Sequence, residues 1–250
     1  MFKVSTYEVS MLKDVFASIA KIVEEGIIKI EKEKGLVFSA ADKAMVSVVR
    51  VNILPTVFEE FEGEDTEVGI NVDEFASLLK RGTKRDKLTL TLERNRLNII
   101  LENGAYRKFE LPTLTITESE LPNIDQLEPN FKAKAEIKSD VFKQILDDAK
   151  QVGDEIEIYT DGNSLKFGCT GELSSVEVVL TREREGLLGL EVSEPSRARY
   201  AIDYLSALAR VTKVADIAIL QWATDFPIKI TFRETDRIIF EFVVAPRTIE

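Results

Sequence analysis

The 250-residue sequence contains no histidine and only one cysteine, Cys169. Without histidine, no Ser-His-Asp or Cys-His catalytic arrangement and no HExxH zinc helix is possible. A single cysteine cannot form an internal disulfide, which is typical of a reducing compartment, and we expect Cys169 to be a small apolar filler beside Phe167. No GxxxxGKS/T loop or GxGxxG turn is present to hold a nucleotide phosphate. We therefore expect no catalytic residue, no metal site and no cofactor.

Long apolar runs and positive charge are also scarce. No run approaches the roughly 20 residues that a membrane span requires, and the opening MFKVSTYEVS has no signal-peptide core, so we expect a cytoplasmic protein without a membrane partner. The 33 Lys and Arg are outnumbered by 44 Asp and Glu, which gives a net charge of −11. At this acid content, carboxylate pairs such as Glu59-Glu60 are interpreted as solvated surface. Abundant Lys and Glu with few Asn, Gln and Met favour a thermophilic source.

What the sequence does contain is an internal repeat. Residues 10–51 align without a gap with residues 139–180 at an offset of 129, and residues 72–90 align with 202–220 at an offset of 130. Lys80, for example, aligns with Arg210, and Asp86 aligns with Asp216. Two similar domains indicate a symmetric object, which favours assembly over a single catalytic pocket.

Each half of the chain is predicted to contain two units of the order strand, helix, strand, strand, strand. Apolar residues at helical spacing predict helices over 9–24, 72–81, 139–151 and 202–212. Alternating and β-branched runs between turn residues predict the strands. These strands are expected at 2–8, 26–32, 35–40, 45–52, near Val68, 87–92, 96–101, 105–111, 131–138, 155–160, 164–169, 174–181, 196–201, 216–221, 227–233 and 237–244.

The order of these elements predicts an α+β fold of two similar domains, with the helices on one face of antiparallel sheets. Between the halves runs ESELPNIDQLEP, whose two prolines and interspersed acids argue against a long helix or strand. We therefore predict domains at residues 1–117 and 130–250, joined by a linker at 118–129.

The predicted helices carry much of the chain's scarce positive charge on the faces opposite their apolar stripes. We expect Ala17 and Ala207 to share these exposed faces with charged residues. The cations of the four faces and their exits are Lys13, Lys21, Lys80, Arg81, Lys84, Lys143, Lys150, Arg210 and Lys213.

Six acids accompany the nine cations, so these faces carry about +3 and the rest of the chain about −14. On a single helix, an ordinary solvated face would explain such charges. The same bias on four helices of an acidic protein instead favours a function. A surface polarised in this way attracts a phosphate backbone at one place while the rest of the protein repels it.

Several segments together resemble the sliding DNA clamps of archaea and eukaryotes, the proliferating cell nuclear antigen family. They are SMLKDVFASIAKIVEEG, SAADKAMVSVVRV, GINVDEFASLLKRG, QVGDEI, TDFPIKITF and VVAPR, in this order from the first helix to the C-terminal strand. The resemblance extends over effectively the whole chain. It implies the DNA clamp fold, in which two domains of like topology form one third of a six-domain ring.

The resemblance further implies that three subunits close head to tail, with the helices lining a channel for duplex DNA. The donor edge would be about 106–111, with Arg107, Lys108 and Phe109. The acceptor edge would be about 174–180, with Ser175, Val176, Glu177 and Val178. The cations of one edge and the acids of the other, with Glu172 nearby, make the pairing electrostatically favourable.

The nine helix cations would make loose, sequence-independent phosphate contacts in such a channel. Asp14 and Asp147 stand where further cations would be expected. Either they pair with neighbouring lysines or this subunit contributes less to DNA contact.

The resemblance also implies a front-face pocket for partner peptides that insert one aliphatic and two aromatic side chains. By position the pocket residues would be Ala41, Met45, Val46, Val48, Leu121, Ile124, Phe226, Pro227, Val243, Ala245 and Pro246. The apolar linker residues Leu121, Ile124 and Leu127 could equally attach the linker to the sheet.

The expected function is that of a DNA polymerase processivity factor in an archaeon, without enzymatic activity and associated with the nucleoid in the cytoplasm. Its expected partners are duplex DNA, DNA polymerase, flap endonuclease, DNA ligase and a clamp loader, the proteins binding through PIP-box-type peptides. A homotrimer and a heterotrimer of paralogous subunits fit the sequence equally. The alternative is a non-ring two-domain adaptor that binds only protein.

Overall fold

The computed structural model describes residues 2–116 and 123–247. The chain divides into two compact units. The first comprises Met1–Met45, Val49–Pro122 and Glu234–Phe240, and the second comprises Val46–Val48, Asn123–Arg233 and Glu241–Glu250. The predicted boundary at residue 117 falls outside the described residues, and the predicted domain limits stay predictions.

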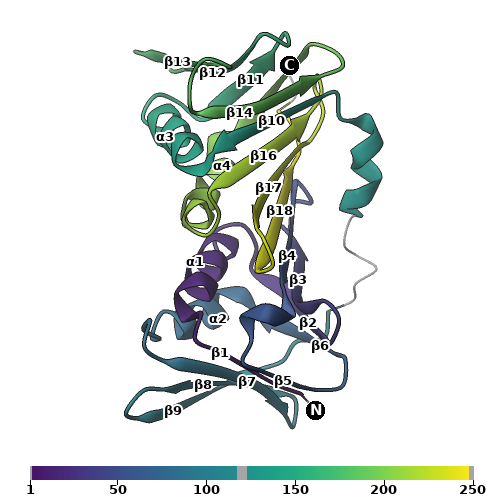
Figure 1. Ribbon diagram of the computed structural model, residues 1–250, viewed down its shortest axis with the longest axis vertical. Coiled ribbons are helices and arrows are strands. Elements are labelled where there is room, and N and C mark those ends of the chain that lie inside the picture. The colour runs from purple at the N-terminus through teal and green to yellow at the C-terminus, as the bar shows by residue number, and fades with distance from the viewer. Residues whose placement is uncertain (1, 117–122, 248–250) are drawn as a thin grey trace. The chain divides into compact units, whose positions relative to one another are not determined.

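The elements of the first half alternate as the sequence predicts (Figure 1). In chain order they are β1 (Phe2–Thr6), α1 (Val9–Ile19), β2 (Glu25–Glu31), β3 (Gly35–Ala41), β4 (Ser47–Ile53), the 3-10 helix η1 (Pro55–Val57), β5 (Glu60–Gly63), β6 (Thr66–Asn71), α2 (Val72–Leu79), β7 (Lys87–Glu93), β8 (Arg96–Glu102) and β9 (Tyr106–Pro112).

The second half repeats this order after a 3-10 helix. Its elements are η3 (Ile124–Asn130), β10 (Ala133–Lys138), α3 (Ser139–Lys150), β11 (Glu155–Thr160), β12 (Ser164–Thr170), β13 (Ser175–Thr181), β14 (Leu187–Val192), β15 (Ser196–Ala201), α4 (Ile202–Ser206), the 3-10 helix η4 (Ala207–Lys213), β16 (Ile217–Trp222), β17 (Ile228–Glu234) and β18 (Ile238–Val244).

Strand pairing confirms that the two halves share one topology. In the first, β1 pairs with both β5 and β7 and β2 pairs with β6, while in the second β10 pairs with β14 and β16 and β11 pairs with β15, all antiparallel. The strand orders are β5-β1-β7-β8-β9 and β4-β3-β2-β6 in the first half, and β14-β10-β16-β17-β18 and β13-β12-β11-β15 in the second. The predicted sequence repeat is therefore a repeat of structure.

In the first unit, α1 packs against α2, and the aromatic core lies beneath the two helices. Phe16 of α1 makes edge contacts with Phe38 of β3 and Phe75 of α2, at ring-centroid distances of 5.4 and 4.7 Å. All three rings are fully buried. Burial of such rings contributes about 2 to 3 kcal/mol each, so the apolar stripes fix which face of each helix remains exposed.

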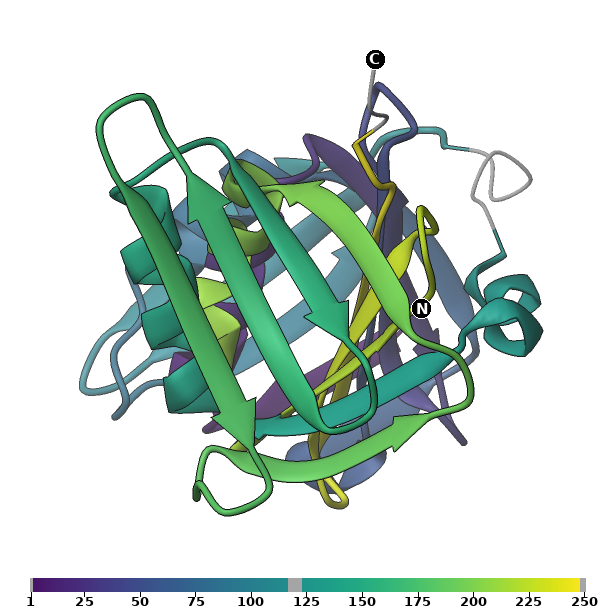
Figure 2. The same cartoon turned by 90° about the horizontal axis from the view of Figure 1, so that it is seen from above.

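The second unit has an equivalent core. Helix α3 packs against α4 and η4 and contacts strands of both sheets, including β10 and β12 (Figure 2). Phe142 of α3 lies 6.3 Å from Phe232 of β17, and Trp222 of β16 is fully buried with its indole N–H directed at the Ser196 carbonyl. Cys169 is buried and its thiol faces the Ala149 carbonyl at 3.4 Å, which confirms the predicted filler role.

Two predicted helices differ from the structure, and two strands were not predicted. Helix α1 ends at Ile19 rather than residue 24, because Lys21 and Ile22 continue in tight turns back to Ser18 and Ile19. The fourth helix changes from α to 3-10 geometry at Ala207. Strands β5 and β14 were not predicted, because EFEG is short and acidic and LLGLEV contains a glycine. Both add to the outer edge of the first strand of their half.

The prediction that Ala17 and Ala207 lie on exposed faces was wrong. Ala17 is 7% exposed and Ala207 is 3% exposed. Helix α1 buries Met11 and Ser18 as well, because it packs on α2 and, through Phe16, on Phe38 of β3, so its covered arc is wider than one apolar stripe. No helix in the described ranges is long and apolar enough to cross a membrane.

Candidate nucleic-acid interface and partner surfaces

The strongest concentration of exposed cations is the turn between α2 and β7, which we call the basic turn (residues 80–85, KRGTKR). Lys80, Arg81, Lys84 and Arg85 are all exposed, and none forms an ion pair with a residue that the structure describes. The turn begins where α2 ends, with Lys80 donating its backbone N–H to Ala76. Arg85 was not among the predicted cations. It was missed because it lies outside the helical face used for the prediction.

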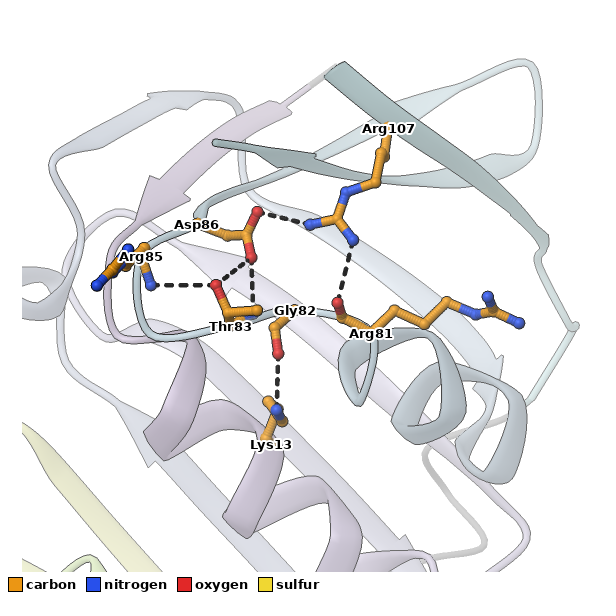
Figure 3. Close-up of polar contacts among 7 residues, drawn as sticks. All are labelled: Lys13, Arg81, Gly82, Thr83, Arg85, Asp86 and Arg107. Carbon is orange, nitrogen blue, oxygen red and sulfur yellow. Dashed lines mark hydrogen bonds and ion pairs between the residues drawn. The ribbon is translucent and has the colours of Figure 1, made fainter. Parts of the chain in front are cut away.

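A buried carboxylate, that of Asp86, holds the basic turn on the side that faces Arg107 (Figure 3). Asp86 is 1% exposed. Its Oδ2 accepts the backbone N–H and the hydroxyl of Thr83, both at 2.7 Å, and its Oδ1 accepts Arg107 Nη2 at 2.6 Å. Burial alone would raise the pKa of Asp86, but the Thr83 and Arg107 hydrogen bonds outweigh it and hold the pKa below its ordinary value.

Two further cations satisfy carbonyl groups of the same turn. Lys13 Nζ from α1 donates to the Gly82 carbonyl at 2.7 Å, and Arg107 Nη1 from β9 donates to the Arg81 carbonyl at 3.1 Å. These carbonyls follow the C-terminal end of α2, where the helix dipole places partial negative charge that cations stabilise. Lys13 is therefore engaged with the protein backbone. Lys21, by contrast, is exposed and has no ion pair among the described residues.

The predicted cations of the second half are largely paired. Lys143 forms an i, i+4 ion pair with Asp147 on α3, and Lys150 reaches Asp203 of α4 at 3.1 Å. For Asp147, the structure thus resolves the open alternative in favour of pairing with a neighbouring lysine. Arg210 and Lys213 are exposed on η4.

The two strands expected to form the subunit interface are both edge strands. β9 is the last strand of β5-β1-β7-β8-β9, and β13 is the first strand of β13-β12-β11-β15. An unpaired edge is a template for another chain. The adjoining side chains are unusually open for apolar residues, since Tyr106 is 63% exposed and Leu173, just before β13, is 100% exposed.

The cations of the β9 edge have contacts within their own unit. Arg107 is directed to Asp86 and Arg81, and Lys108 pairs with Glu93 and Glu110 at 3.7 and 3.2 Å. The Arg81 guanidinium carbon lies over the Phe109 ring, 5.7 Å from the ring centroid. On β13, Ser175 and Glu177 are exposed while Val176 and Val178 are half-buried. The attraction expected between the two edges stays a prediction.

The predicted partner pocket is placed only in part. Leu121 lies outside the described residues. Among the other predicted pocket residues, Met45 is exposed. The half-buried ones are Ala41, Val46, Phe226, Pro227, Ala245 and Pro246, and the buried ones are Val48, Ile124 and Val243. Within the second unit, Ala245 donates its backbone N–H to the Val46 carbonyl at 2.9 Å, and Phe226 makes an edge contact with Phe131. The pocket assignment stays a prediction.

The described part of the linker is attached to the second unit. Ile124 is 3% exposed, and Glu128 of η3 pairs with Lys229 of β17 while accepting Gln221 Nε2 at 3.0 Å. Lys229 also reaches Glu241 at 3.2 Å and is 6% exposed. Burial would lower the pKa of Lys229, but its hydrogen bonds with Glu128 and Glu241 outweigh this and raise it. This attachment favours the anchoring role of Ile124.

Comparison with known proteins identifies the family. The family model for the N-terminal domain of proliferating cell nuclear antigen matches residues 1–121, and the family model for its C-terminal domain matches residues 124–247. The chain belongs to the proliferating cell nuclear antigen family. It is 34% identical to the DNA polymerase sliding clamp of Thermococcus gammatolerans, over 95% of this chain and 94% of the relative.

Solved members of this family share the DNA clamp fold seen here. A crystal structure of proliferating cell nuclear antigen from Thermococcus kodakaraensis matches with a TM-score of 0.88 and 25% identity, covering 99% of this chain and all of the other. The PCNA2–PCNA3 complex of Sulfolobus tokodaii matches with a TM-score of 0.89 and 23% identity, covering 98% and 99%. The predicted fold class is therefore confirmed for this clamp-family chain.

Proposed function

We propose that this chain is a DNA polymerase sliding clamp, one subunit of a trimeric ring that encircles duplex DNA. The observation that carries the proposal is the match of both clamp domains over nearly the whole chain, together with relatives that are named DNA polymerase sliding clamps. The comparisons do not support the non-ring adaptor that was the alternative.

Ring closure would pair β9 of one subunit with β13 of the next. Such a head-to-tail interface is heterologous, and it closes because each subunit presents two different free edges. The exposed Tyr106 and Leu173 support this pairing, since both lie beside these edges. The Sulfolobus tokodaii complex contains two clamp proteins, so a ring of paralogous subunits is proposed beside the homotrimer.

In this proposal DNA is held by topology, and the protein performs no catalysis. The helix and turn cations need only loose contacts with phosphates, because a closed ring prevents escape. Lys21, Lys80, Arg81, Lys84 and Lys213 are exposed and suited to this role. Loose contact permits sliding, since no position on the DNA is then a deep energy minimum.

The ring would tether partner enzymes at the predicted front-face pocket. DNA polymerase, flap endonuclease, DNA ligase and an ATP-driven clamp loader would bind there through short peptides with one aliphatic and two aromatic anchors. Aromatic anchors in an apolar pocket dominate the affinity of such interfaces. We place the protein in the archaeal cytoplasm, associated with the nucleoid.

Two measurements test the proposal. The solution mass should be three times the 28.2 kDa of the chain, alone or with a paralogous subunit. Clamps loaded on nicked circular DNA should stay bound and should leave when the circle is cut, because only topology retains them. A monomeric mass under all conditions, or equal retention on linear and circular DNA, would refute the ring.

A variant with Arg81, Lys84 and Lys143 changed to Ala should keep the ring mass and lower polymerase processivity. The matched control changes Lys32, Lys166 and Arg233 to Ala, which removes the same charge from sites away from the helices. Equal processivity in the two variants would remove the helix and turn cations from the DNA path.

A further inference from the structure

The basic turn is supported from two elements of the first unit and from the residue that follows it. Lys13 comes from α1, Arg107 comes from the edge strand β9, and Asp86 lies directly before β7 (Figure 3). A turn with four exposed cations would normally sample many conformations, because its like charges repel one another. Here its backbone is fixed at Arg81, Gly82 and Thr83.

The contacts that fix the backbone of the basic turn leave its cationic side chains available to bind an anion. The side chains of Lys80, Lys84 and Arg85 have no ion pair among the residues described, although acids make up 44 of the 250 residues. The nearest acid in the sequence, Asp86, is buried, and both of its carboxylate oxygens are occupied by Thr83 and Arg107. Its charge is thus compensated by the half-buried Arg107, and the cations of the turn have no acid partner there.

Arg107 joins this turn to the strand expected at the subunit boundary. Its fork donates at once to the Asp86 carboxylate and to the Arg81 carbonyl, at 2.6 and 3.1 Å. Two residues along β9, the Phe109 ring lies beneath the Arg81 guanidinium. A lysine would not reproduce this geometry, because its ammonium lacks the planar fork whose two nitrogens, Nη1 and Nη2, each face one of the acceptors.

We propose that Asp86 and Arg107 are positioning residues that hold the basic turn ready for phosphate and couple it to the β9 edge. The inference rests on the proposed clamp function. Lys80, Lys84 and Arg85 would contact DNA phosphates, and Asp86 and Arg107 would act through the turn without touching DNA. Pairing of β9 with a neighbouring subunit would then stabilise the geometry that DNA binds, and DNA would stabilise that pairing in return.

The direction in which one substitution changes the affinity for duplex DNA tests the positioning role. Asp86→Ala removes an acid close to the DNA-contacting cations, so charge alone requires tighter binding of duplex DNA. The proposal requires the opposite: the assembled ring should bind a short duplex about threefold to tenfold more weakly, because hydrogen bonds that order the turn are lost. The matched control is Asp216→Ala, since Asp216 aligns with Asp86 and is exposed. Its binding should be unchanged or tighter.

Thr83→Val covers the case in which Asp86→Ala does not fold. It deletes the hydroxyl that donates to Asp86 and accepts the Arg85 backbone N–H at 3.3 Å, at an exposed site and without a change of charge. It should weaken DNA binding about twofold to threefold at unchanged ring mass. Binding at least as tight as wild type in Thr83→Val, or tighter binding in a folded Asp86→Ala ring, overturns the positioning role.

Arg107→Lys tests the coupling, because it keeps the charge of β9 and loses the fork. In the wild type, a short duplex should slow dissociation of the ring into subunits. In Arg107→Lys this effect of DNA should be lost, measured against the dissociation rate of the same variant without DNA. An equal effect of DNA in both proteins overturns the coupling. A wild-type chain that forms no ring or binds no duplex in these assays would instead refute the clamp function itself.

Discussion

The two halves of the chain share a topology and use their charged residues differently. In the first, the segment after α2 reads KRGTKRD, with four exposed cations above the buried Asp86. The aligned segment of the second half, Arg210–Asp216, reads RVTKVAD, with Val211 and Ala215 buried and Asp216 exposed. The duplicated backbone thus carries the basic turn in one copy, whereas the end of the fourth helix in the other copy has no such cluster of cations.

The supporting residues show the same divergence. Lys13, which donates to the basic turn, aligns at the offset of 129 with Phe142, a fully buried core residue of α3. Conversely, Lys143 and Lys150 of α3 are paired with Asp147 and Asp203. Apolar core positions dictate the fold of each half, whereas exposed positions are free to diverge, so fold symmetry does not imply equal DNA contact.

In the part of the chain that the structure describes, each half contains an ion cluster around a buried charged side chain, with a different task. In the first, Asp86 and Arg107 order the basic turn. In the second, Lys229 with Glu128 and Glu241 attaches the linker helix η3 to β17. Removing one member of a buried cluster is costly because it leaves uncompensated charge behind.

The largest expected loss of stability follows from a substitution in the second half. Lys229→Met leaves Glu128 and Glu241 without their shared cation, and we expect it to lower the free energy of unfolding by about 2 to 4 kcal/mol, less than a fully buried pair because Glu128 is partly solvated. Urea unfolding of the second unit at neutral pH measures this. The matched variant Lys166→Met, on β12, should stay within about 0.5 kcal/mol of wild type. Similar losses in both variants would show that Lys229 has no special anchoring role.

An effect of intermediate size is expected for the contribution of Asp86 to stability, which should be lost at acid pH. Since the folded-state pKa of Asp86 lies below its ordinary value of about 3.9, its ionised form stabilises the fold above that value. This contribution is lost as pH falls through the folded pKa. Asp86→Asn should therefore cost about 1 to 3 kcal/mol at neutral pH, and the difference from wild type should shrink below about pH 4. A difference that stays constant from neutral to acid pH would contradict the assigned charge state.

The smallest effect on stability is expected for two substitutions that would give the second half unpaired cations like those of the basic turn. Asp147→Asn together with Asp203→Asn releases Lys143 and Lys150 from exposed pairs, each worth at most about 1 kcal/mol to stability. We expect duplex affinity of the ring to rise severalfold and its dependence on salt to steepen, by up to about one unit of the log-log slope per released cation. The control Asp73→Asn together with Glu74→Gln, at the exposed start of α2, should produce less. Unchanged salt dependence would mean that α3 does not face the DNA.

The sequence supported the fold predictions where patterns are local. Periodic apolar residues such as Leu12, Phe16 and Phe142 located the helices, and alternation located most strands. β5 and β14 escaped, because their short acidic or glycine-containing sequences become strands only when β1 and β10 offer an edge. The extent of burial at Ala17 was missed for a related reason, since it depends on two packing partners of α1 and not on its own periodicity.

The sequence by itself determined the repeated order of elements and the concentration of cations near the helices, whereas the edge positions of β9 and β13 were implied only by the family resemblance. The first two follow from side-chain periodicity, which acts over a few residues. Only the tertiary structure decided which cations are engaged. Lys13 meets Gly82, Arg107 meets Asp86 and Lys150 meets Asp203 across separations of 21 to 69 residues. Electrostatic interactions depend on distance in space, and packing of the apolar core sets those distances.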